Sequence, residues 1–248
     1  MYRNNIIITG AGSGLGKYLQ KYFEVQGLVR NSSLDLINNK SVVIHCAYNN
    51  KKLTNDKDNE LYNDNVMLTK KILKKDPAIM VYMSSVEVYL DKEKNNHEDD
   101  DLKDSKYNDL YAEYKYLSEC LINNYSGKNI IFRMPLLLSN ESRDNTVKKV
   151  IDSYDGKLSL NEESNFYCIS YDDVARTISD LLENNIFGTF NLCPNKKITL
   201  NHIKKLARTN PRFGDYVYES PNIDNHKIKS VVKYFDKTSE DTVLEFLR

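Results

Sequence analysis

Short apolar runs alternate along this chain with longer segments in which apolar residues recur at the spacing of one helix face. The expected strands are Asn5–Thr9, a weak strand at Gly27–Arg30, Val42–Ala47, Ile79–Ser84, Ile130–Met134 and Thr189–Cys193. The expected helices are Leu15–Phe23, Val66–Leu73, Leu110–Ile122 and Asp172–Leu182. Near-continuous apolar strands that alternate with helices are typical of a parallel sheet covered on both faces, so the pattern predicts an α/β fold with a doubly wound sheet.

The pattern is less regular after Leu136. We expect one unit over residues 1–248, in which residues 1–135 form mainly the dinucleotide-binding core and residues 136–248 combine segments that return to that core with a small substrate lobe. Segments near 136–165 and 195–248 are expected to place this lobe over the carboxyl edge of the sheet, where open α/β sheets bind ligands. The polar stretch Asp91–Lys106 is expected to be a solvated loop in which His97 is exposed.

Composition narrows the class of protein. The 248 residues carry a formal net charge of zero, which disfavours a nucleic-acid partner held by bulk attraction to phosphate. No apolar run is long enough to span a membrane, and the N-terminus leads directly into a strand-like segment, so we expect neither membrane insertion nor a signal peptide. The widely spaced cysteines predict reduced thiols in a cytoplasmic protein and no metal site; they are Cys46, Cys120, Cys168 and Cys193.

A Gly-rich turn, TGAGSGLG at Thr9–Gly16, follows the first expected strand and opens the first expected helix. Small residues let the backbone approach a pyrophosphate, and the helix N-terminus offers free N–H groups and the positive end of the helix dipole. The spacing G-x-x-x-G-x-G is met by Gly10, Gly14 and Gly16, whereas Leu15 breaks the simpler G-x-G-x-x-G pattern. In this strand–turn–helix context the turn predicts a dinucleotide site of the Rossmann type; the alternative is a tight turn without a ligand.

Three residues carry candidate chemistry. Tyr111 and Lys115 are four apart on an expected helix and share one face, so the ammonium can stabilise the phenolate and lower the pKa of the phenol. Ser85 lies at the carboxyl end of an expected strand, where its hydroxyl can polarise a carbonyl or alcohol. Together they fill the roles needed for hydride chemistry at a C–OH or C=O group. The alternative is a serine that merely ends a strand beside a surface Tyr–Lys pair.

These motifs, in their order, resemble the extended short-chain dehydrogenases, the NAD-dependent epimerase/dehydratase group that acts on nucleotide sugars. The segments that carry the resemblance are TGAGSGLG, SVVIHCAY, NVMLTKKIL, VYMSSVEVY, YAEYKYLSE, FRMPLLLS, FYCISYDDVARTI and GTFNLCPNKKITLNHI. The resemblance implies catalytic roles for Ser85, Tyr111 and Lys115. With the Gly-rich turn and the end of the second strand, it gives these expected cofactor residues: Thr9, Gly10, Ser13, Gly14, Leu15, Gly16, Arg30, Asn31, Ser32, Asp35, Leu36, Ala47, Tyr48, Asn65, Ser84, Tyr111, Lys115 and Pro135.

The chain departs from the group in ways that bear on the reaction. It is shorter between the first strand and VVIHCA and in the C-terminal lobe. Glu87 matches the second acid of the sugar 4,6-dehydratases, but Val86 stands where their aspartate would be, which disfavours elimination. Arg30 follows the weak second strand where NAD-selective sites usually have an acid, and an arginine there accommodates a 2′-phosphate, so NADP(H) is expected in preference to NAD(H). If the second strand is misplaced, Arg30 is only a surface residue.

NADPH is the usual biosynthetic reductant, so the favoured hypothesis is reduction of a nucleotide-linked 4-keto-6-deoxy sugar with Tyr111 as proton donor. The alternatives are a nucleotide-sugar epimerase with retained NAD and a non-enzymatic dinucleotide-binding sensor. Family members often form homodimers through two helices per subunit, here Asn65–Lys75 and Leu110–Asn123. Candidate substrate contacts are Arg143, Tyr167 and Arg212.

Overall fold

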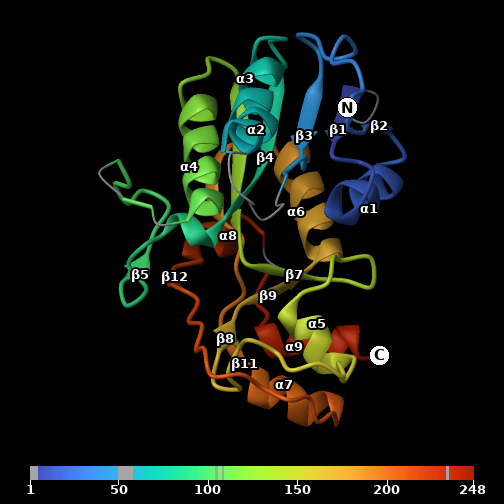
Figure 1. The fold of residues 1–248 in the computed structure, drawn as a ribbon. Coiled ribbons are helices and arrows are strands. Elements are labelled where there is room, and N and C mark those ends of the chain that lie inside the picture. The colour runs from blue at the N-terminus through green and yellow to red at the C-terminus, as the bar shows by residue number, and fades with distance from the viewer. Residues whose placement is uncertain (1–4, 50–57, 104–105, 108, 233–234) are drawn as a thin grey trace.

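A six-stranded parallel sheet forms the centre of the protein in the computed structural model, which describes residues 5–49, 58–103, 106–107, 109–232 and 235–248 (Figure 1). Its strand order is β10-β6-β4-β3-β1-β2, and every neighbouring pair is parallel. The strands are β1 (Ile6–Thr9), β2 (Gln26–Leu28), β3 (Val42–His45), β4 (Ile79–Ser85), β6 (Lys128–Met134) and β10 (Gly188–Asn191). The predicted α/β fold with a Rossmann-type doubly wound sheet is confirmed.

The direction of winding changes on the two sides of β1. The chain first adds β2 on one side of β1 and then crosses to add β3 on the other side. Residues 29–41, which make this crossover, form turns without a regular helix or strand, which accounts for the short spacing before VVIHCA. Because β2 ends at Leu28, Arg30 lies beyond the strand, in the loop at the carboxyl edge of the sheet. A ligand crevice is expected where the winding reverses.

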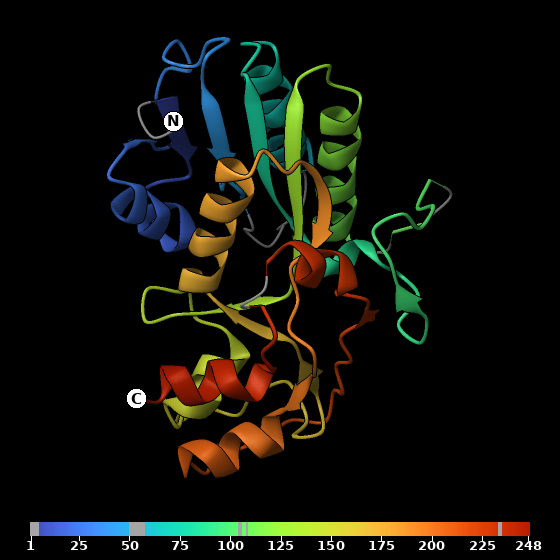
Figure 2. The same ribbon diagram turned by 180° about the vertical axis from the view of Figure 1, so that it is seen from behind.

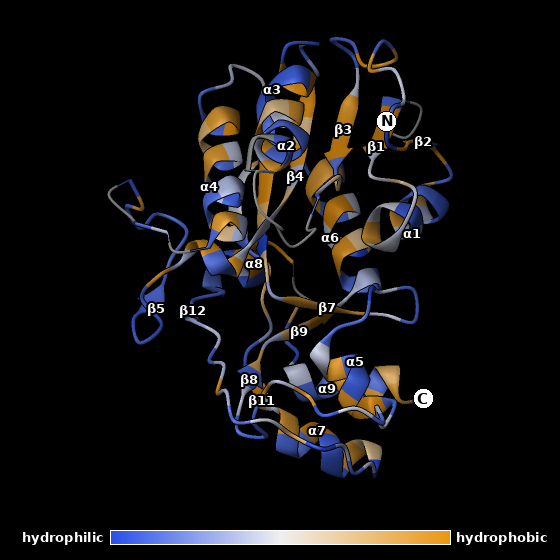
Figure 3. Cartoon of the chain, in the orientation of Figure 1, coloured by the Kyte–Doolittle hydropathy of each residue, from blue (hydrophilic) through white to orange (hydrophobic). Residues whose placement is uncertain are grey.

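Helices cover both faces of the sheet (Figures 1 and 2). On one face α1 (Gly14–Phe23) packs against α6 (Tyr171–Glu183), and on the other α3 (Leu68–Leu73) packs against α4 (Leu110–Asn123). Consecutive strand residues point to opposite faces, so Ile8 joins the core under α1 and α6. Its neighbour Ile7 joins the core under α3 and α4. Figure 3 shows largely hydrophobic strands in the sheet and helices that combine hydrophobic and hydrophilic residues.

Side-chain caps fix where the two long helices begin. Asp109 accepts a hydrogen bond from the backbone N–H of Tyr111 at the start of α4. Ser170 and Asp173 form a reciprocal capping box at the start of α6. These caps satisfy N–H groups that lack partners inside the helix, and they set the register in which α4 presents its side chains. Before α3 the chain forms α2 (Asp58–Tyr62) and a short π-helix, η2 (Asn63–Met67).

A second, smaller core lies beyond the carboxyl edge of the sheet. There β7 (Leu136–Leu138) pairs with β9 (Cys168–Ser170), and β8 (Asn165–Phe166) pairs with β11 (Ile198–Thr199). The helices α5 (Thr146–Ile151), α7 (Leu200–Ala207) and α9 (Ser239–Phe246) complete this lobe. Its buried residues are Leu138, Val147, Val150, Leu158, Cys168, Ile198, Leu200, Ile203 and Val243. In contrast, α8 (His226–Val231) returns to the sheet, where it contacts β10 and buries Ile228 in the main core.

The polar stretch Asp91–Lys106 is anchored to the rest of the protein through Asn95–Asn96, through the buried Glu98, which accepts from the backbone N–H of Asn191, and through the buried Leu102. Within it, β5 (Asn95–Asn96) pairs with β12 (Asn222–Ile223). The buried amide of Asn96 donates to the backbone carbonyls of Asp91, Lys94 and Asn222. The structure therefore adds a short ladder to the expected solvated loop, while the His97 side chain remains 53% exposed, as predicted.

The sequence also led to expectations about the cysteines, membrane-spanning segments and metal sites. All four cysteines are free thiols. Within the described part of the chain, no helix has the length and apolarity required to cross a membrane. Among the same residues, no three histidine, cysteine or acidic side chains come together as metal ligands.

Candidate active site

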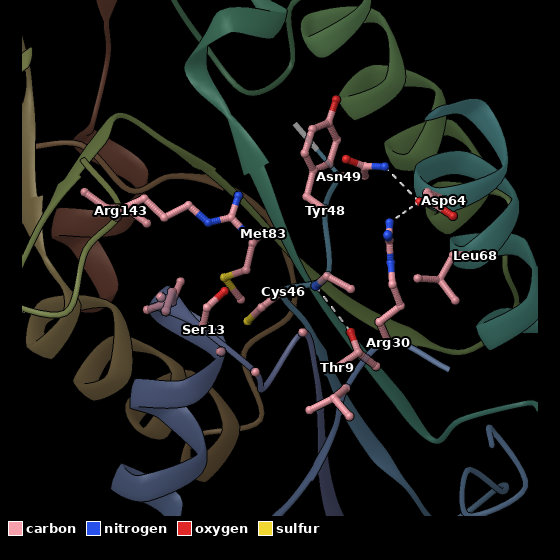
Figure 4. A pocket seen from close by; sticks show the side chains of 18 of the residues that line it. Thr9, Ser13, Arg30, Cys46, Tyr48, Asn49, Asp64, Leu68, Met83 and Arg143 are labelled. Carbon is pink, nitrogen blue, oxygen red and sulfur yellow. Dashed lines mark hydrogen bonds and ion pairs between the residues drawn. The ribbon is translucent and has the colours of Figure 1, made fainter. Parts of the chain in front are cut away.

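A cavity of about 1210 Å³ runs along the carboxyl ends of the strands, at the place where the winding of the sheet reverses. Figure 4 shows side chains that point into it from several elements. The expected cofactor residues that line it are Thr9, Gly10, Ser13, Gly14, Leu15, Gly16, Arg30, Asn31, Ser32, Ala47, Tyr48, Ser84, Tyr111, Lys115 and Pro135. Asp35, Leu36 and Asn65 are not among the lining residues.

The Gly-rich turn follows β1 and leaves no room for side chains at two positions. Gly10 has a φ of +74°, and a Cβ there would lie 2.6 Å from the backbone nitrogen of Ala47. A Cβ at Gly16 would lie 2.4 Å from the carbonyl oxygen of Gly10. Glycine is therefore required at both positions, which lets the turn lie against the segment after β3 and leaves the N-terminus of α1 facing the cavity.

A tyrosine from α6 contacts the N-terminus of α1. A Cβ built at Gly14 would lie 3.3 Å from the Tyr171 hydroxyl, so this hydroxyl lies beside the first turn of α1. Burial raises the pKa of this hydroxyl to about 12, and the nearby Arg143 guanidinium acts in the opposite direction. Arg143, a candidate substrate contact, thus lines the large cavity beside the Gly-rich turn, on the side opposite Arg30 (Figure 4). The guanidinium of Arg143 therefore adds positive charge to the part of the cavity that the N-terminus of α1 also lines.

A series of buried, hydrogen-bonded side chains lies next to the Gly-rich turn, on the side facing the sheet. Thr9 Oγ1 lies 2.6 Å from His45 Nδ1 and accepts a hydrogen bond from the backbone N–H of Ala47. His45 Nε2 lies 3.1 Å from the Thr69 hydroxyl, which also donates to the Ser118 hydroxyl on α4. Burial lowers the pKa of His45 to about 3, and the charge of Lys115 acts in the same direction, so the ring is neutral. This series links the strand ends to the helix that carries Tyr111 and Lys115.

An ion pair lies where β2 ends. The guanidinium of Arg30 pairs with the carboxylate of Asp64 on η2, and the side-chain amide of Asn49 donates to the same oxygen of Asp64 at 2.8 Å (Figure 4). All three residues line the large cavity. Asn65, expected to touch the cofactor, is buried behind them, where its side chain exchanges two hydrogen bonds with the backbone of Asn49. It shapes the loop after β3.

Asp35 and Leu36 were expected among the cofactor-binding residues. Asp35 instead lies outside the cavity lining, paired with Lys75 at 2.7 Å and with Ser33, and these contacts hold the pKa of its carboxyl below the usual value. Leu36 is an exposed apolar residue. Their predicted contact with a cofactor stays a prediction.

Two of the three candidate catalytic residues, Tyr111 and Lys115, line the large cavity, and the third, Ser85, lines the neighbouring small cavity together with Tyr111. Ser85 ends β4, and its hydroxyl, which accepts a hydrogen bond from the backbone N–H of Glu87 at 3.2 Å, is near enough to the Tyr111 phenol in the first turn of α4 to act on its pKa. Lys115 lies one turn further on, with its ammonium 5.8 Å from the centre of the Tyr111 ring. The ring of Tyr48 packs edge-on against Tyr111 at 5.1 Å, and the Lys115 ammonium lies 4.3 Å from the centre of the Tyr48 ring.

The electrostatics of this group differ from the simple expectation. Burial raises the pKa of Tyr111. The nearby hydroxyl of Ser85 acts to lower that pKa, and the negative charge of Glu87 acts to raise it further. Lys115 donates to the backbone carbonyl of Met83 at 2.6 Å, and burial lowers its pKa to about 7. Tyr111 and Lys115 thus share one helix face as predicted, but the ammonium is bonded to the β4 backbone. Its action on the pKa of Tyr111 stays a prediction.

A second cavity of about 240 Å³ opens on the other side of Tyr111. It is lined by Ser85, Val86, Glu87, Tyr111, Met134, Pro135, Leu136, Phe166, Tyr167, Tyr218 and Ser220. Glu87, in a short 3-10 helix (η3, Val86–Val88), accepts a hydrogen bond from the Tyr218 hydroxyl. The ring of Tyr218 stacks on Phe166 at 4.9 Å. Tyr111, Met134, Pro135 and Leu136 line both cavities and therefore form the wall between the large cavity and the small, partly aromatic one.

The three candidate substrate contacts have different positions. Tyr167 lines the small cavity, and Arg143 lines the large one. Arg212 lines neither, because its guanidinium donates to the backbone carbonyl of Asp155 within the lobe at 2.6 Å. Sequence reasoning missed Asp64 and Tyr218. Asp64 immediately precedes Asn65, which was a usable signal, whereas no local pattern connects Tyr218 to Glu87.

Two comparisons place this architecture among known proteins. Solved structures with a similar fold include MoeE5 in complex with UDP-glucose and NAD, at a TM-score of 0.81 and 15% identity, covering 98% of this chain and 97% of that one. The UDP-glucuronic acid 4-epimerase from Bacillus cereus, in complex with UDP-glucuronic acid and NAD, gives 0.74 and 16%, covering 97% and 96%. The UDP-glucose 4-epimerase from Thermotoga maritima, with UDP-glucose, gives 0.75 and 14%, covering 98% and 97%.

At the level of sequence, no curated protein matches the chain significantly. The profile of the NAD dependent epimerase/dehydratase family, however, matches residues 29–193, from the end of β2 through the candidate catalytic residues to the segment after β10. This match spans more than half of the chain and agrees with the resemblance that its motifs show. The protein therefore belongs to the NAD dependent epimerase/dehydratase family.

Proposed function

We propose that the protein is an enzyme that transfers hydride between a nicotinamide dinucleotide and the sugar ring of a nucleotide sugar, with Tyr111 as acid–base group. The observation that carries this proposal is that Tyr111 lines both cavities. A side chain that moves a proton while hydride passes between two bound molecules must reach the reacting carbon's oxygen beside the cofactor, and this position meets that requirement.

The residues of the large cavity fit a dinucleotide. Gly10 and Gly16 clear the backbone for a pyrophosphate, the N-terminus of α1 faces it, and Arg143 supplies positive charge. The volume of about 1210 Å³ exceeds that of ordinary small-molecule pockets. When bound, the dinucleotide supplies a hydride acceptor and donor. The small cavity, at about 240 Å³ and with aromatic walls, suits one sugar ring.

Each side chain then has a role derived from its position. Ser85 lines the small cavity beside Tyr111, where its hydroxyl can bond the oxygen of the sugar and align it with the phenol. Tyr111 takes the proton of the sugar hydroxyl when that carbon loses a hydride, and gives a proton to the carbonyl oxygen when the carbon receives a hydride. Lys115, anchored on the Met83 carbonyl, keeps a buried donor beside the rings of Tyr48 and Tyr111. Tyr48 and Pro135 exclude water around the reacting atoms.

Two reactions use this arrangement. Epimerisation with a retained NAD is supported by the named activities of the similar structures, two of which are UDP-sugar 4-epimerases solved with UDP-sugars. Reduction of a 4-keto-6-deoxy sugar, the first hypothesis from sequence, is supported by Arg30 alone, which suggests NADPH. Elimination has no support, because Val86 lines the small cavity where an acid would be needed. We propose epimerisation first, with reduction as the second candidate.

The test incubates the purified protein with UDP-glucose, UDP-galactose or UDP-glucuronic acid and NAD⁺, and follows the sugar by NMR. In parallel, nucleotide-linked 4-keto-6-deoxy sugars are mixed with NADH or NADPH, and reduced-cofactor absorbance is followed. A new C4 epimer without net cofactor change supports the epimerase, and cofactor consumption supports the reductase. Tyr111→Phe should abolish either, whereas Tyr22→Phe, an exposed tyrosine outside both cavities, should not. Cofactor binding with neither reaction would favour the sensor hypothesis.

Two further features stay predictions. A homodimer would use α3 and α4, which lie side by side on one face of the sheet (Figure 1). Cytoplasmic location follows only from the sequence argument about reduced thiols.

A further inference from the structure

The acid missing from the end of β2 is supplied by another element. Rossmann sites selective for NAD usually carry an Asp or Glu after the second strand, which hydrogen-bonds the hydroxyls of the adenosine ribose. Here Arg30, Asn31 and Ser32 occupy that loop and line the cavity, without an acid among them. Asp64, from η2 on the opposite wall, reaches the same place and pairs with Arg30 (Figure 4).

The position of Asp64 is fixed by two donors. The Arg30 guanidinium and the Asn49 amide both bond Oδ2. Asn49 is in turn held by Asn65, which accepts from its backbone N–H at 2.7 Å and donates to its carbonyl at 3.0 Å. Among the described residues, both of these donors bond Oδ2, and Asp64 lines the cavity, so Oδ1 can accept hydrogen bonds from vicinal ribose hydroxyls.

The same carboxylate disfavours a phosphate. A 2′-phosphate carries close to two negative charges, and beside Arg30 it would lie next to Asp64, which repels it and already uses the guanidinium. Glu60 and Lys71 also line the cavity, but their formal charges are opposite and cancel. The interaction with a 2′-phosphate is therefore decided by Arg30 and Asp64. A neutral hydroxyl pair meets an acceptor there, whereas a phosphate meets an occupied arginine and an anion.

We propose that Asp64, held by Arg30 and Asn49, makes this protein select NAD(H) over NADP(H). The inference rests on the proposed function only in that a nicotinamide dinucleotide occupies the large cavity. It reverses the preference that Arg30 suggests when the sequence is considered alone, because the partner of Arg30 comes from residues that lie 34 positions away. Asp64 is thereby a specificity-determining residue, and Arg30 and Asn49 are positioning residues.

The test measures dissociation constants of NAD⁺ and NADP⁺ by calorimetry, without sugar, on full-length protein freed of copurified nucleotide. We expect the unmodified protein to bind NAD⁺ about tenfold more tightly than NADP⁺ or better. Asp64→Asn keeps the shape, releases Arg30 and removes the repelling charge, so NADP⁺ affinity should rise about tenfold while NAD⁺ affinity falls. Adding Arg30→Ala to Asp64→Asn should cancel the gain in NADP⁺ affinity.

The matched control is Asp215→Asn, which removes the same charge from an exposed ion pair with Lys157 outside both cavities and should change neither constant. Arg30→Ala alone tests whether Arg30 or Asp64 determines the cofactor preference. If Asp64 determines it, this variant still binds NADP⁺ weakly. Preference of the unmodified protein for NADP⁺, or an unchanged ratio in Asp64→Asn, would overturn the inference while leaving the sugar chemistry intact. Selective NAD⁺ binding without any activity on nucleotide sugars would leave the inference standing and refute the proposed function.

Discussion

The hydroxyl of Tyr218, in the segment before β12, donates a hydrogen bond to the carboxylate of Glu87, in the turn after β4. This bond joins the two walls of the small cavity, and the ammonium of Lys92 lies 4.8 Å from the centre of the Tyr218 ring. Because the charge of Glu87 acts to raise the pKa of Tyr111, the hydrogen bond between Tyr218 and Glu87 lies where it can influence the candidate acid–base group.

Replacing Glu87 by Gln should move the pH dependence of turnover. Gln removes the negative charge that acts to raise the pKa of Tyr111, so the limb of the kcat/KM profile that reports Tyr111 should shift by about 0.5 pH unit to lower pH. Tyr218→Phe leaves the negative charge of Glu87 but removes the hydroxyl that donates to it, so the same limb should shift to higher pH. Glu163→Gln, at an exposed position of the lobe, is the control. Identical profiles for all four proteins would show that Tyr111 does not sense Glu87.

Replacing Gly10 by Ala should weaken both folding and cofactor binding. The new Cβ would lie 2.6 Å from the Ala47 backbone at a φ of +74°, so we expect the free energy of unfolding to fall by about 2 kcal/mol or more. Gly12→Ala is a matched control in the same turn, because its Cβ would meet only Val29 at an ordinary 3.5 Å. Urea titrations and NAD⁺ calorimetry distinguish the two variants; equal stability would contradict the required close approach.

Lys115 should make stability depend on pH. Burial lowers its pKa from 10.5 to about 7, so between these values the unfolded chain binds more protons than the folded one. Stability is therefore gained as pH rises through this window and lost as pH falls towards 7. The free energy of unfolding of the unmodified protein, minus that of Lys115→Met, should increase from pH 7 to 10 in urea titrations. A difference that does not change with pH would show that burial does not lower the pKa of Lys115; Lys40→Met, at an exposed position, is the control variant.

A buried ion pair stabilises the base of the site. Arg133 on β6 pairs with Glu119 on α4 at 2.7 Å, the two side chains are 5% and 1% exposed, and Ser84 also donates to Glu119. Glu119→Gln leaves the arginine charge buried and should cost about 3–5 kcal/mol of unfolding free energy.

The comparison for that cost is Glu141→Gln, which breaks the exposed pair with Lys21 and should cost less than about 1 kcal/mol. Thermal and urea unfolding measure both variants. The double replacement Arg133→Met with Glu119→Leu should lose less than the two single replacements combined, since neither charge is then left unpaired. Additive losses would show that the pair does not act as a unit.

The sequence by itself determined the sheet, its helices and most of one site. Periodicity located every strand of the main sheet to within a few residues, because buried parallel strands must be continuously apolar. The spacings of Gly10 to Gly16 and of Tyr111 to Lys115 are local, and local geometry places such residues on one turn or one helix face. The weak second strand was located one to two residues late, because its three residues carry little pattern.

Only the tertiary structure decided which distant groups meet. It placed Asp64 against Arg30, Tyr218 against Glu87 and Arg143 beside the Gly-rich turn, and it directed the Lys115 ammonium to the Met83 carbonyl. It also placed Asp35 outside the cavity. Charge pairing and burial depend on elements that approach through the packing of the whole sheet and lobe, so no pattern along the chain encodes them.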